Sequence, residues 1–362
     1  MNRAAFLTIL LCLSIATVMR AQPDPTRFTI TAWPDSNADR YFTHDRVWRG
    51  ADGASSIDLG EGRVLWLFGD SIISRDWTGT RVGSFVRNSV GVQAGYELTA
   101  PIKYYWKPTK RGHEAFFSIP GKNWFWPGHG TMIRDRLIIF LFQLRGVNTG
   151  LGFEAFSWYA VLVSNPSDEP SKWKMKYIQG PETFGQMAGS AAVLKDDKYL
   201  YAFGAQEPST HEVYLLRWPL DDAYNGELGG LEWWLNGKWA KRPSREPIPT
   251  PLFIGGTEYS VHFDASIDKY LQIQSFGFGD ATIGLRMADR PEGPWSKPKT
   301  IYRPSYTGIK QPFMYSAKAH PELRTDGLYI TYNVNSFDFS HMLENLNTYF
   351  PKFIRLRIEP RR

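Results

Sequence analysis

The chain has 362 residues, of which 43% are apolar, 15% aromatic and 22% charged, so it can bury a large core and is not a disordered polypeptide. Its 42 basic and 36 acidic residues give a net charge of +6, an excess too small over this length to favour a nucleic-acid-binding or polybasic membrane-binding protein. One or two globular domains are compatible with the length.

The N-terminus has the organisation of a secretory signal peptide. A short basic region that includes Arg3 is followed by an apolar stretch over residues 4–19, and Arg20-Ala21-Gln22 then leads into proline-rich sequence. We therefore predict a signal peptide over residues 1–21, a single mature domain over residues 22–362, and a secreted or periplasmic location. The mature chain would keep 40 basic and 36 acidic residues, a net charge of +4.

The only cysteine of the chain, Cys12, lies in the predicted signal peptide. The mature protein would then contain no cysteine, so it could form neither a disulfide nor a thiolate metal site and would have no cysteine nucleophile. No other apolar run approaches the roughly 18 residues that a membrane span requires. We expect a monomer with no membrane span.

A two-strand element recurs five times after Gln22: a strand with small residues at its start, a charged turn, and a strongly apolar second strand. The second strands are predicted at residues 64–69, 137–142, 199–204, 270–275 and 328–333. Third strands are predicted at residues 89–95, 157–164, 212–218 and 282–288, and residues 353–358 would complete the last repeat. The spacings between marker residues in successive second strands are 73, 62, 71 and 57 residues, which suits four strands and their loops; the markers are Leu65, Ile138, Leu200, Leu271 and Leu328. We therefore predict an all-β five-bladed β-propeller, because a two-sheet sandwich would not explain five copies of one hairpin.

In a propeller, the starts of the innermost strands meet at one end of the central channel. Asp52 and Glu258 are the two carboxylates at equivalent strand starts. Glycosidic bond hydrolysis needs one carboxylic acid and one carboxylate, so these two form the predicted pair, with Asp52 as base and Glu258 as acid. The structural alternative is that Asp52-Gly53 only forms a turn.

Asp70 is a third candidate catalytic residue. It follows the second strand of the first repeat, and if that strand is straight it lies on the far side of the hairpin, although Gly69 could form a bulge that redirects it. Arg87 and Asn88 enter the next strand and could hold a carboxylate or sugar hydroxyls. A surface ion pair is the alternative for Arg87.

Two histidines and two aromatic residues complete the predicted substrate-binding set. His129 lies between two glycines and His320 precedes a proline, and each could orient substrate or be a hydrogen-bonded structural residue. Trp126 and Tyr259 could stack on sugar rings or pack in the core. Because the histidines show no paired spacing within one element, we predict no metal site and no cofactor.

Several of these segments resemble a known family. Residues 52–56, 65–71, 87–89 and 126–130 resemble secreted bacterial propellers related to endo-D-arabinanases, and residues 287–295 and 315–323 are similar to the wider arabinanase, β-fructosidase and β-mannoside-processing propellers. The resemblance implies a retaining or inverting glycosidase with acidic residues around the channel, of which Asp52 is the most transferable. Where arabinanase-type enzymes place further acids, this chain has His129 and Gly189-Ser190.

The sequence therefore predicts an exported glycoside hydrolase that acts on a polysaccharide, with an arabinofuranan-type polymer as the expected class. A non-catalytic glycan-binding propeller and a polysaccharide lyase that uses His with Tyr or Arg remain as alternatives.

Overall fold

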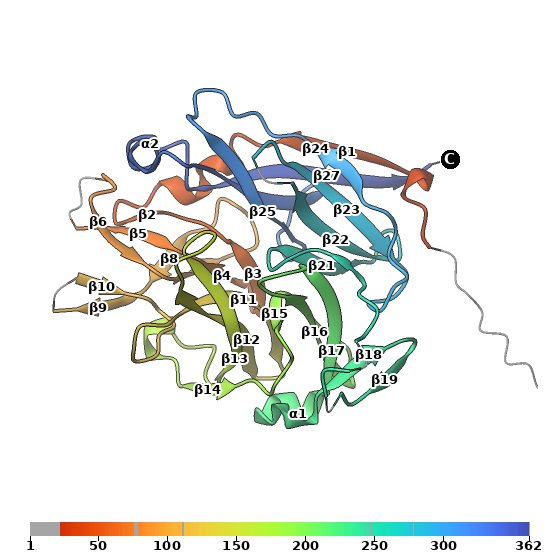
Figure 1. Ribbon diagram of the computed structural model, residues 1–362. Helices are drawn as coiled ribbons and strands as arrows, with labels where there is room; N and C mark the ends of the chain where they lie inside the picture. The colour runs from red at the N-terminus through yellow and green to blue at the C-terminus, as the bar shows by residue number, and fades with distance from the viewer. Residues whose placement is uncertain are drawn as a thin grey trace, which may run out of the picture.

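The computed structural model describes residues 22–75, 79–110, 112–242, 244–246, 248–277 and 279–361. The predicted signal peptide lies outside these residues. Most regular structure is β-strand (Figure 1), and the all-β class predicted from the sequence is confirmed. The helices of the described chain are short: α1 (Leu220–Asn225), α2 (Phe339–Glu344) and the 3-10 helices η1 (Pro25–Arg27), η2 (Ala38–Thr43), η3 (Pro170–Lys172) and η4 (Leu228–Gly230).

Five sheets of four or more strands contain most of the strands in the described part of the chain. Sheet I contains β3 (Ser55–Gly60), β4 (Arg63–Phe68), β7 (Ser89–Ala94) and β8 (Ile102–Tyr105). Sheet II contains β11 (Trp124–Ile133), β12 (Arg136–Gly146), β13 (Phe153–Val163) and β14 (Met175–Gln179). Sheet III contains β15 (Gln186–Lys195), β16 (Tyr199–Gln206), β17 (Glu212–Pro219), β18 (Glu232–Leu235) and β19 (Lys238–Ala240), with β20 (Phe253–Ile254) paired to β17.

Sheets IV and V complete the set. Sheet IV contains β21 (Tyr259–Asp264), β22 (Lys269–Phe276), β23 (Thr282–Ala288) and β24 (Lys299–Tyr302). Sheet V contains β25 (Pro312–His320), β26 (Leu328–Ser336), β27 (Pro351–Pro360) and β1 (Phe28–Pro34). Two smaller sheets flank sheet I, one of β2 (Trp48–Ala51), β5 (Ser71–Ser74) and β6 (Gly83–Val86), the other of β9 (Lys107–Thr109) and β10 (Gly112–Glu114).

The predicted second and third strands of the repeats are confirmed. Each predicted second strand lies in the second strand of its sheet, namely β4, β12, β16, β22 or β26. Strand β12 shows why these runs are so apolar: its residues from Leu137 to Leu144 are all buried, because neighbouring sheets cover both of its faces.

The first strands of the five sheets contact one another in a closed order. β3 contacts β11, β11 contacts β15, β15 contacts β21, β21 contacts β25, and β25 contacts β3. Sheets I to V therefore surround a common centre, and sheet V lies across that centre from sheets II and III. Because each first strand runs in the same sense in its sheet, the starts of all five first strands meet at one end, here called the upper end.

The two ends of the chain close sheet V. β1 pairs with β27 in antiparallel register from Phe28 opposite Pro360 to Pro34 opposite Ile354. Residues 353–358 were predicted to complete the last repeat; they lie in β27, and β1, from the N-terminal side, adds the fourth strand. This pairing covers the edge that β27 would otherwise expose.

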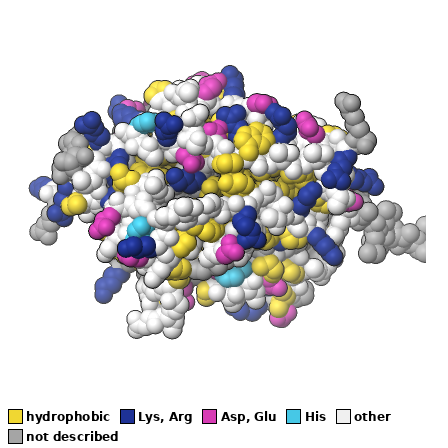
Figure 2. All heavy atoms as spheres, turned by 90° about the horizontal axis from the view of Figure 1, so that it is seen from above, with side chains coloured by type: hydrophobic (Ala, Val, Ile, Leu, Met, Phe, Trp, Pro, Cys, Tyr) yellow, Lys and Arg dark blue, Asp and Glu magenta, His cyan; other side chains and the backbone are white. Residues whose placement is uncertain are grey.

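The surface carries mixed charge. Over the face seen in Figure 2, Lys and Arg side chains are interspersed with Asp and Glu, and hydrophobic side chains lie between them. No helix in the described part of the chain has the length and apolar character of a membrane span.

Candidate active site

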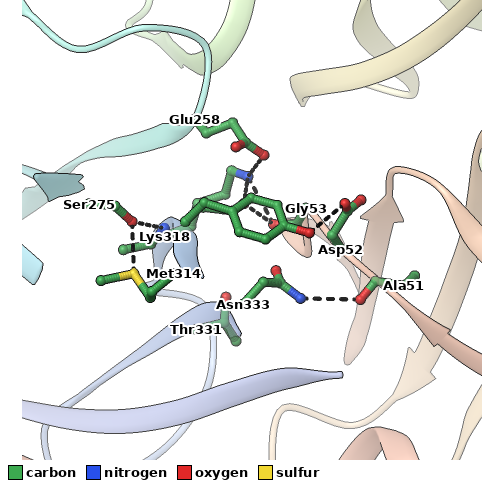
Figure 3. A network of polar contacts seen from close by, with 12 residues as sticks. Ala51, Asp52, Gly53, Glu258, Ser275, Met314, Lys318, Thr331 and Asn333 are labelled. Atoms are coloured by element: carbon green, nitrogen blue, oxygen red, sulfur yellow. Dashed lines mark hydrogen bonds and ion pairs between the residues drawn. The ribbon is translucent and has the colours of Figure 1, made fainter. Parts of the chain in front are cut away.

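Asp52 lies at the upper end, in the turn between β2 and β3. The backbone carbonyl groups of three consecutive residues, Ala51, Asp52 and Gly53, each accept a hydrogen bond there. Asn333 Nδ2 donates to Ala51 O at 3.2 Å, and the Gly69 amide donates to Asp52 O at 2.9 Å. Lys318 Nζ donates to Gly53 O at 2.8 Å. Figure 3 shows Asn333 directed at Ala51 and Lys318 beside Gly53. Bonds from three other strands or loops thus fix the direction of the Asp52 carboxyl.

The Asp52 carboxyl accepts a hydrogen bond from Tyr315 of β25, with 2.8 Å between the tyrosine hydroxyl and Oδ2. Burial raises the pKa of Asp52 well above its usual range, and the negative charges of Asp70 and Glu258 raise it further. Asp52 therefore interacts electrostatically with both other predicted catalytic carboxylates, although they come from the ends of different strands. The structure brings the three predicted catalytic residues into one electrostatic cluster.

Asp70 lies at the same end as Asp52, contrary to the sequence expectation for a straight strand. β3 and β4 are antiparallel, so the start of β3 at Ser55 lies opposite Leu67 near the end of β4. Gly69 and Asp70 form the bend from β4 to β5, and a Cβ on Gly69 would collide with Asp52 Oδ1. The glycine therefore lets the two carboxyl groups approach.

Two side chains bind the Asp70 carboxyl. Trp126 Nε1 donates to Oδ1 at 2.8 Å, and Arg87 Nη1 donates to Oδ2 at 3.2 Å. The Arg87 guanidinium also lies 4.4 Å above the ring of Trp124. Burial raises the pKa of Asp70 to about 6, although the bonds from Trp126 and Arg87 oppose this rise. Predicted residues Arg87 and Trp126 are thus both in the site, where they contact Asp70.

Glu258 precedes β21 and faces the Lys318 ammonium group, with 3.8 Å between Nζ and Oε1. Figure 3 shows Glu258 and Asp52 on different sides of Lys318. The Glu258 side chain is 38% exposed, whereas that of Lys318 is 6% exposed. Burial lowers the pKa of Lys318, and the charges of Glu258 and Asp52 oppose that shift. Glu258 is therefore an accessible carboxylate next to a buried cation.

A fourth carboxyl group, Glu207, was not predicted. Burial raises the pKa of Glu207, the hydrogen bond from His211 at 2.9 Å lowers it, and the charge of Glu258 raises it. Glu207 lines a hollow of about 430 Å³ together with Trp126, Phe153 and Thr257. A sequence signal existed: Glu207 directly follows the second strand of sheet III, as Asp70 follows the second strand of sheet I.

The structure does not bring Asn88, Tyr259 and His320 to the site. Asn88 is fully buried, and its amide group donates to Phe117 O and Phe125 O, both at 2.9 Å, so it attaches a loop to β11. Tyr259 is fully buried. His320 is also fully buried; Ser56 Oγ lies 2.5 Å from its Nδ1 and Thr331 Oγ1 2.7 Å from its Nε2. These three side chains are not in a position to contact a substrate.

His129 has a structural role between three sheets. Its Nδ1 accepts from the Val193 amide at 3.1 Å, so Nε2 carries the proton and donates to Ser56 O at 3.0 Å. Burial lowers the pKa of His129 to about 4, so the ring is neutral. The bond to His129 gives the backbone amide of Val193 in β15 a hydrogen-bond acceptor. In the same way, the backbone amide of Ala319 in β25 donates to Ser260 Oγ at 2.8 Å. Polar residues on the first strands therefore partly serve to complete the backbone hydrogen bonding around the centre.

Within the described residues, no three His, Cys, Asp or Glu side chains are gathered as a metal site requires.

Several solved structures are similar to this chain. The chain is similar to a proposed hydrolase from Bacteroides ovatus, with a TM-score of 0.71, 19% identity, and coverage of 94% of this chain and 97% of that chain. The chain is also similar to an α-L-arabinofuranosidase from Podospora anserina in complex with cellotriose, with a TM-score of 0.49, 11% identity, and coverage of 93% of this chain and 98% of that chain. A xylan β-1,4-xylosidase from Bacillus halodurans has a TM-score of 0.48 and 10% identity, with coverage of 88% of this chain and 54% of that chain.

No curated protein matches the chain in sequence. One family does match, over residues 35–358, a range that includes all of Asp52, Asp70, Glu207 and Glu258. The chain therefore belongs to the family described as a domain of unknown function (DUF5005).

Proposed function

We propose that sheets I to V are the five blades of a β-propeller and that the protein is an exported glycoside hydrolase. The closed order of contacts among the first strands supports the propeller. One observation carries the enzymatic proposal: Asp52 is a half-buried residue whose carboxyl pKa is raised by desolvation and by the charges of two neighbouring carboxylates, one of which, Glu258, is accessible. Glycosidic bond cleavage requires one carboxyl group that donates a proton and one carboxylate that attacks C1 or activates water.

The surroundings favour a division of roles opposite to the one expected from the sequence. The raised pKa of Asp52 favours its protonated form, whereas the Lys318 ammonium group attracts the negative charge of Glu258. In the proposed reaction, Asp52 protonates the leaving glycosidic oxygen, and the Glu258 carboxylate either attacks C1 or activates a water molecule. Both Asp70 oxygens accept hydrogen bonds, so Asp70 acts through its charge and position rather than as the proton donor.

The lyase alternative has less support, because the histidines it would use are occupied. Both ring nitrogens of His129 and both of His320 lie within hydrogen-bond distance of protein groups, and burial lowers the pKa of each ring. A base that abstracts a proton from a uronic acid needs a free nitrogen or oxygen directed at the substrate.

The test is reducing-sugar release from a polysaccharide panel that begins with arabinan, the class that the sequence resemblance supports. The mature protein is compared with Asp52→Asn, Glu258→Gln and a control, Asp197→Asn, which changes an exposed carboxylate in the turn between β15 and β16. We expect the first two variants to lose activity and the control variant to keep the activity of the wild type. Equal activity of all four proteins would contradict the site, and binding without cleavage would favour a glycan-binding propeller.

Aryl glycosides separate the two roles. A good leaving group needs no protonation, so Asp52→Asn should retain much of its activity on an aryl glycoside, whereas Glu258→Gln should lose it. The reverse result would restore the assignment of Asp52 as base and Glu258 as acid.

A further inference from the structure

The hollow of about 430 Å³ adjoins two of the carboxylates at the upper end. Its wall includes Trp126, whose Nε1 donates to Asp70 at 2.8 Å, and Thr257, which directly precedes Glu258. Apart from two threonines and two glutamates, the wall consists of aromatic and aliphatic side chains, proline and glycine. This size and this sparse set of polar groups are typical of small-ligand pockets. A sugar bound in the hollow would therefore lie beside the proposed reacting groups.

Within the described part of the chain, no Lys, Arg or His side chain lines the hollow. Of its two glutamates, Glu154 is paired with Arg145, with 2.6 Å between Oε1 and Nη2. The other is Glu207, whose Oε1 accepts a hydrogen bond from His211 Nδ1 at 2.9 Å. Oε2 of Glu207 has no hydrogen-bond partner among the described residues. The hollow thus offers a carboxylate oxygen as an acceptor and no cation.

The backbone fixes Glu207 relative to Glu258. The carbonyl oxygen of His211 accepts hydrogen bonds from the amides of Gly255 at 2.9 Å and Gly256 at 3.2 Å. The turn that follows Glu207 therefore holds the segment that leads to Glu258. Burial raises the pKa of Glu207, and the charge of Glu258 raises it as well, so the two carboxyl groups interact.

The cations that contact the neighbouring carboxylates are already occupied. Arg87 donates to Asp70 at 3.2 Å, and its guanidinium lies over the ring of Trp124. The buried Lys318 ammonium group donates to a backbone carbonyl and lies 3.8 Å from Glu258 (Figure 3). A carboxylate on a bound sugar would find like charges nearby and no cation to pair with, which is costly.

We propose that the hollow is a subsite for an uncharged sugar and that the Glu207 carboxylate selects against acidic sugars there. A hydroxyl group of a neutral sugar would donate to Glu207 Oε2, whereas a uronic acid would bring an unpaired carboxylate next to Glu207 and Glu258. This inference rests on the proposed function and deepens it, because it makes the substrate a neutral glycan.

The test uses oligosaccharide pairs that differ in the charge of one group. One pair is a β-1,4-linked xylo-oligosaccharide with a glucuronic acid branch and its carboxyl-reduced form. The other is an α-1,5-linked arabino-oligosaccharide whose terminal C5 is a carboxylate or an alcohol. The wild type should have about tenfold higher kcat/KM on the neutral member of a pair, and Glu207→Gln only about threefold. The control Asp197→Asn, which removes an exposed carboxylate at the opposite end of β15, should keep the wild-type preference.

Each preference is a ratio measured on one protein, so a general loss of activity in Glu207→Gln cancels. Salt provides a second measurement on the unaltered chain. Raising sodium chloride from about 50 mM to about 500 mM should reduce the wild-type preference by about twofold or more, because salt screens charge repulsion. A preference that comes only from the shape of the hollow would not respond to salt, and that result would contradict the role of Glu207.

The outcomes separate the inference from the proposed function. If the wild type cleaves both members of a pair equally well, prefers the acidic member, or keeps its full preference in Glu207→Gln, the inference is overturned and the glycoside hydrolase stands. If the pairs are bound without being cleaved, the proposed function fails, and the inference is judged by the same ratios taken from dissociation constants. If no member of either pair is bound or cleaved, both are overturned.

Discussion

The hydroxyl group of Tyr315 lies 2.8 Å from Oδ2 of Asp52 and joins the last large sheet of the chain to the first, 263 residues away in sequence. The proton belongs to the tyrosine, because burial and the charges of Asp52 and Glu258 raise the pKa of Tyr315 well above its usual value. The bond favours the carboxylate form of Asp52 and opposes the larger effects of burial and of the Asp70 and Glu258 charges. This contact is therefore one of the interactions that set the pKa of Asp52.

Tyr315→Phe should raise the pKa of Asp52, because it removes a hydrogen bond that lowers it. If Asp52 is the general acid, activity is lost as pH rises through its pKa, so the high-pH limb of the kcat profile should move to higher pH. If Asp52 is instead the base, the low-pH limb should move upward. Profiles of the wild type and Tyr315→Phe on one substrate distinguish these, and identical profiles would mean that Asp52 does not control either limb.

Gly69→Ala should reduce activity without unfolding the protein. The new Cβ would meet Asp52 Oδ1, so the carboxyl must turn away from its position. The matched control is Gly229→Ala, since a Cβ there has nothing within 4 Å. We expect at least a tenfold loss of kcat for Gly69→Ala, because small displacements of a reacting group are costly, and melting temperatures close to the wild type for both variants. Full activity of Gly69→Ala would show that the Asp52 position is not critical.

Asp70→Asn should change stability in a pH-dependent way. The native pKa of Asp70 is about 6, above the ordinary 3.8, so the carboxyl stabilises the fold when protonated, fully below about pH 4. That contribution is lost as pH rises through about 6. Asparagine cannot ionise, so Asp70→Asn should gain stability over the wild type between pH 4 and pH 7, by up to roughly 3 kcal/mol.

Urea denaturation of Asp70→Asn at pH 4, 5, 6 and 7, beside Asp197→Asn, measures this difference. A constant offset across the range would contradict the raised pKa of Asp70. Activity should fall in Asp70→Asn even where stability rises, because its charge is part of the cluster that raises the pKa of Asp52.

The repeated hairpins were predictable because their second strands are rich in apolar residues, most clearly in residues 137–142, which form a continuous apolar run in a strand that is covered on both faces. The positions of single polar residues were harder to predict. His129 and His320 look like ligand-binding residues in sequence, yet they satisfy backbone and hydroxyl groups between sheets. Asp70 was misplaced because the antiparallel register returns the end of β4 to the start of β3. Such outcomes depend on contacts between sheets, which local patterns do not encode.

Arg81→Lys should destabilise the fold. The Arg81 guanidinium is buried, and within the described residues its hydrogen bonds go to uncharged groups, among them the carbonyl oxygens of Arg49, Met342 and Thr348. These bonds hold the segment that ends in Tyr349, whose hydroxyl donates to Asp70 O at 3.0 Å. Lysine cannot reproduce the planar fork, so unpaired carbonyls should lower the free energy of unfolding by about 3 kcal/mol.

Tyr349→Phe removes only the last bond of this series and should lower the free energy of unfolding by about 1 kcal/mol. Denaturant titration of both variants gives the comparison. Equal, small effects of the two changes would show that Arg81 does not organise the segment.

Deletion of residues 22–34 should impair folding although it removes no site residue. β1 supplies the outer strand of sheet V, and Phe28, Ile30 and Ala32 pack against the core shared by sheets IV and V. Without β1, strand β27 would expose an unpaired edge and apolar side chains at the point where the first and last parts of the chain meet. We expect a lower melting temperature and aggregation on heating. A chain with Ile30→Thr keeps the backbone pairing and loses mainly packing, so it should be affected less. If the deleted protein melts like the wild type, the pairing of the chain ends is not needed to hold sheet V in place.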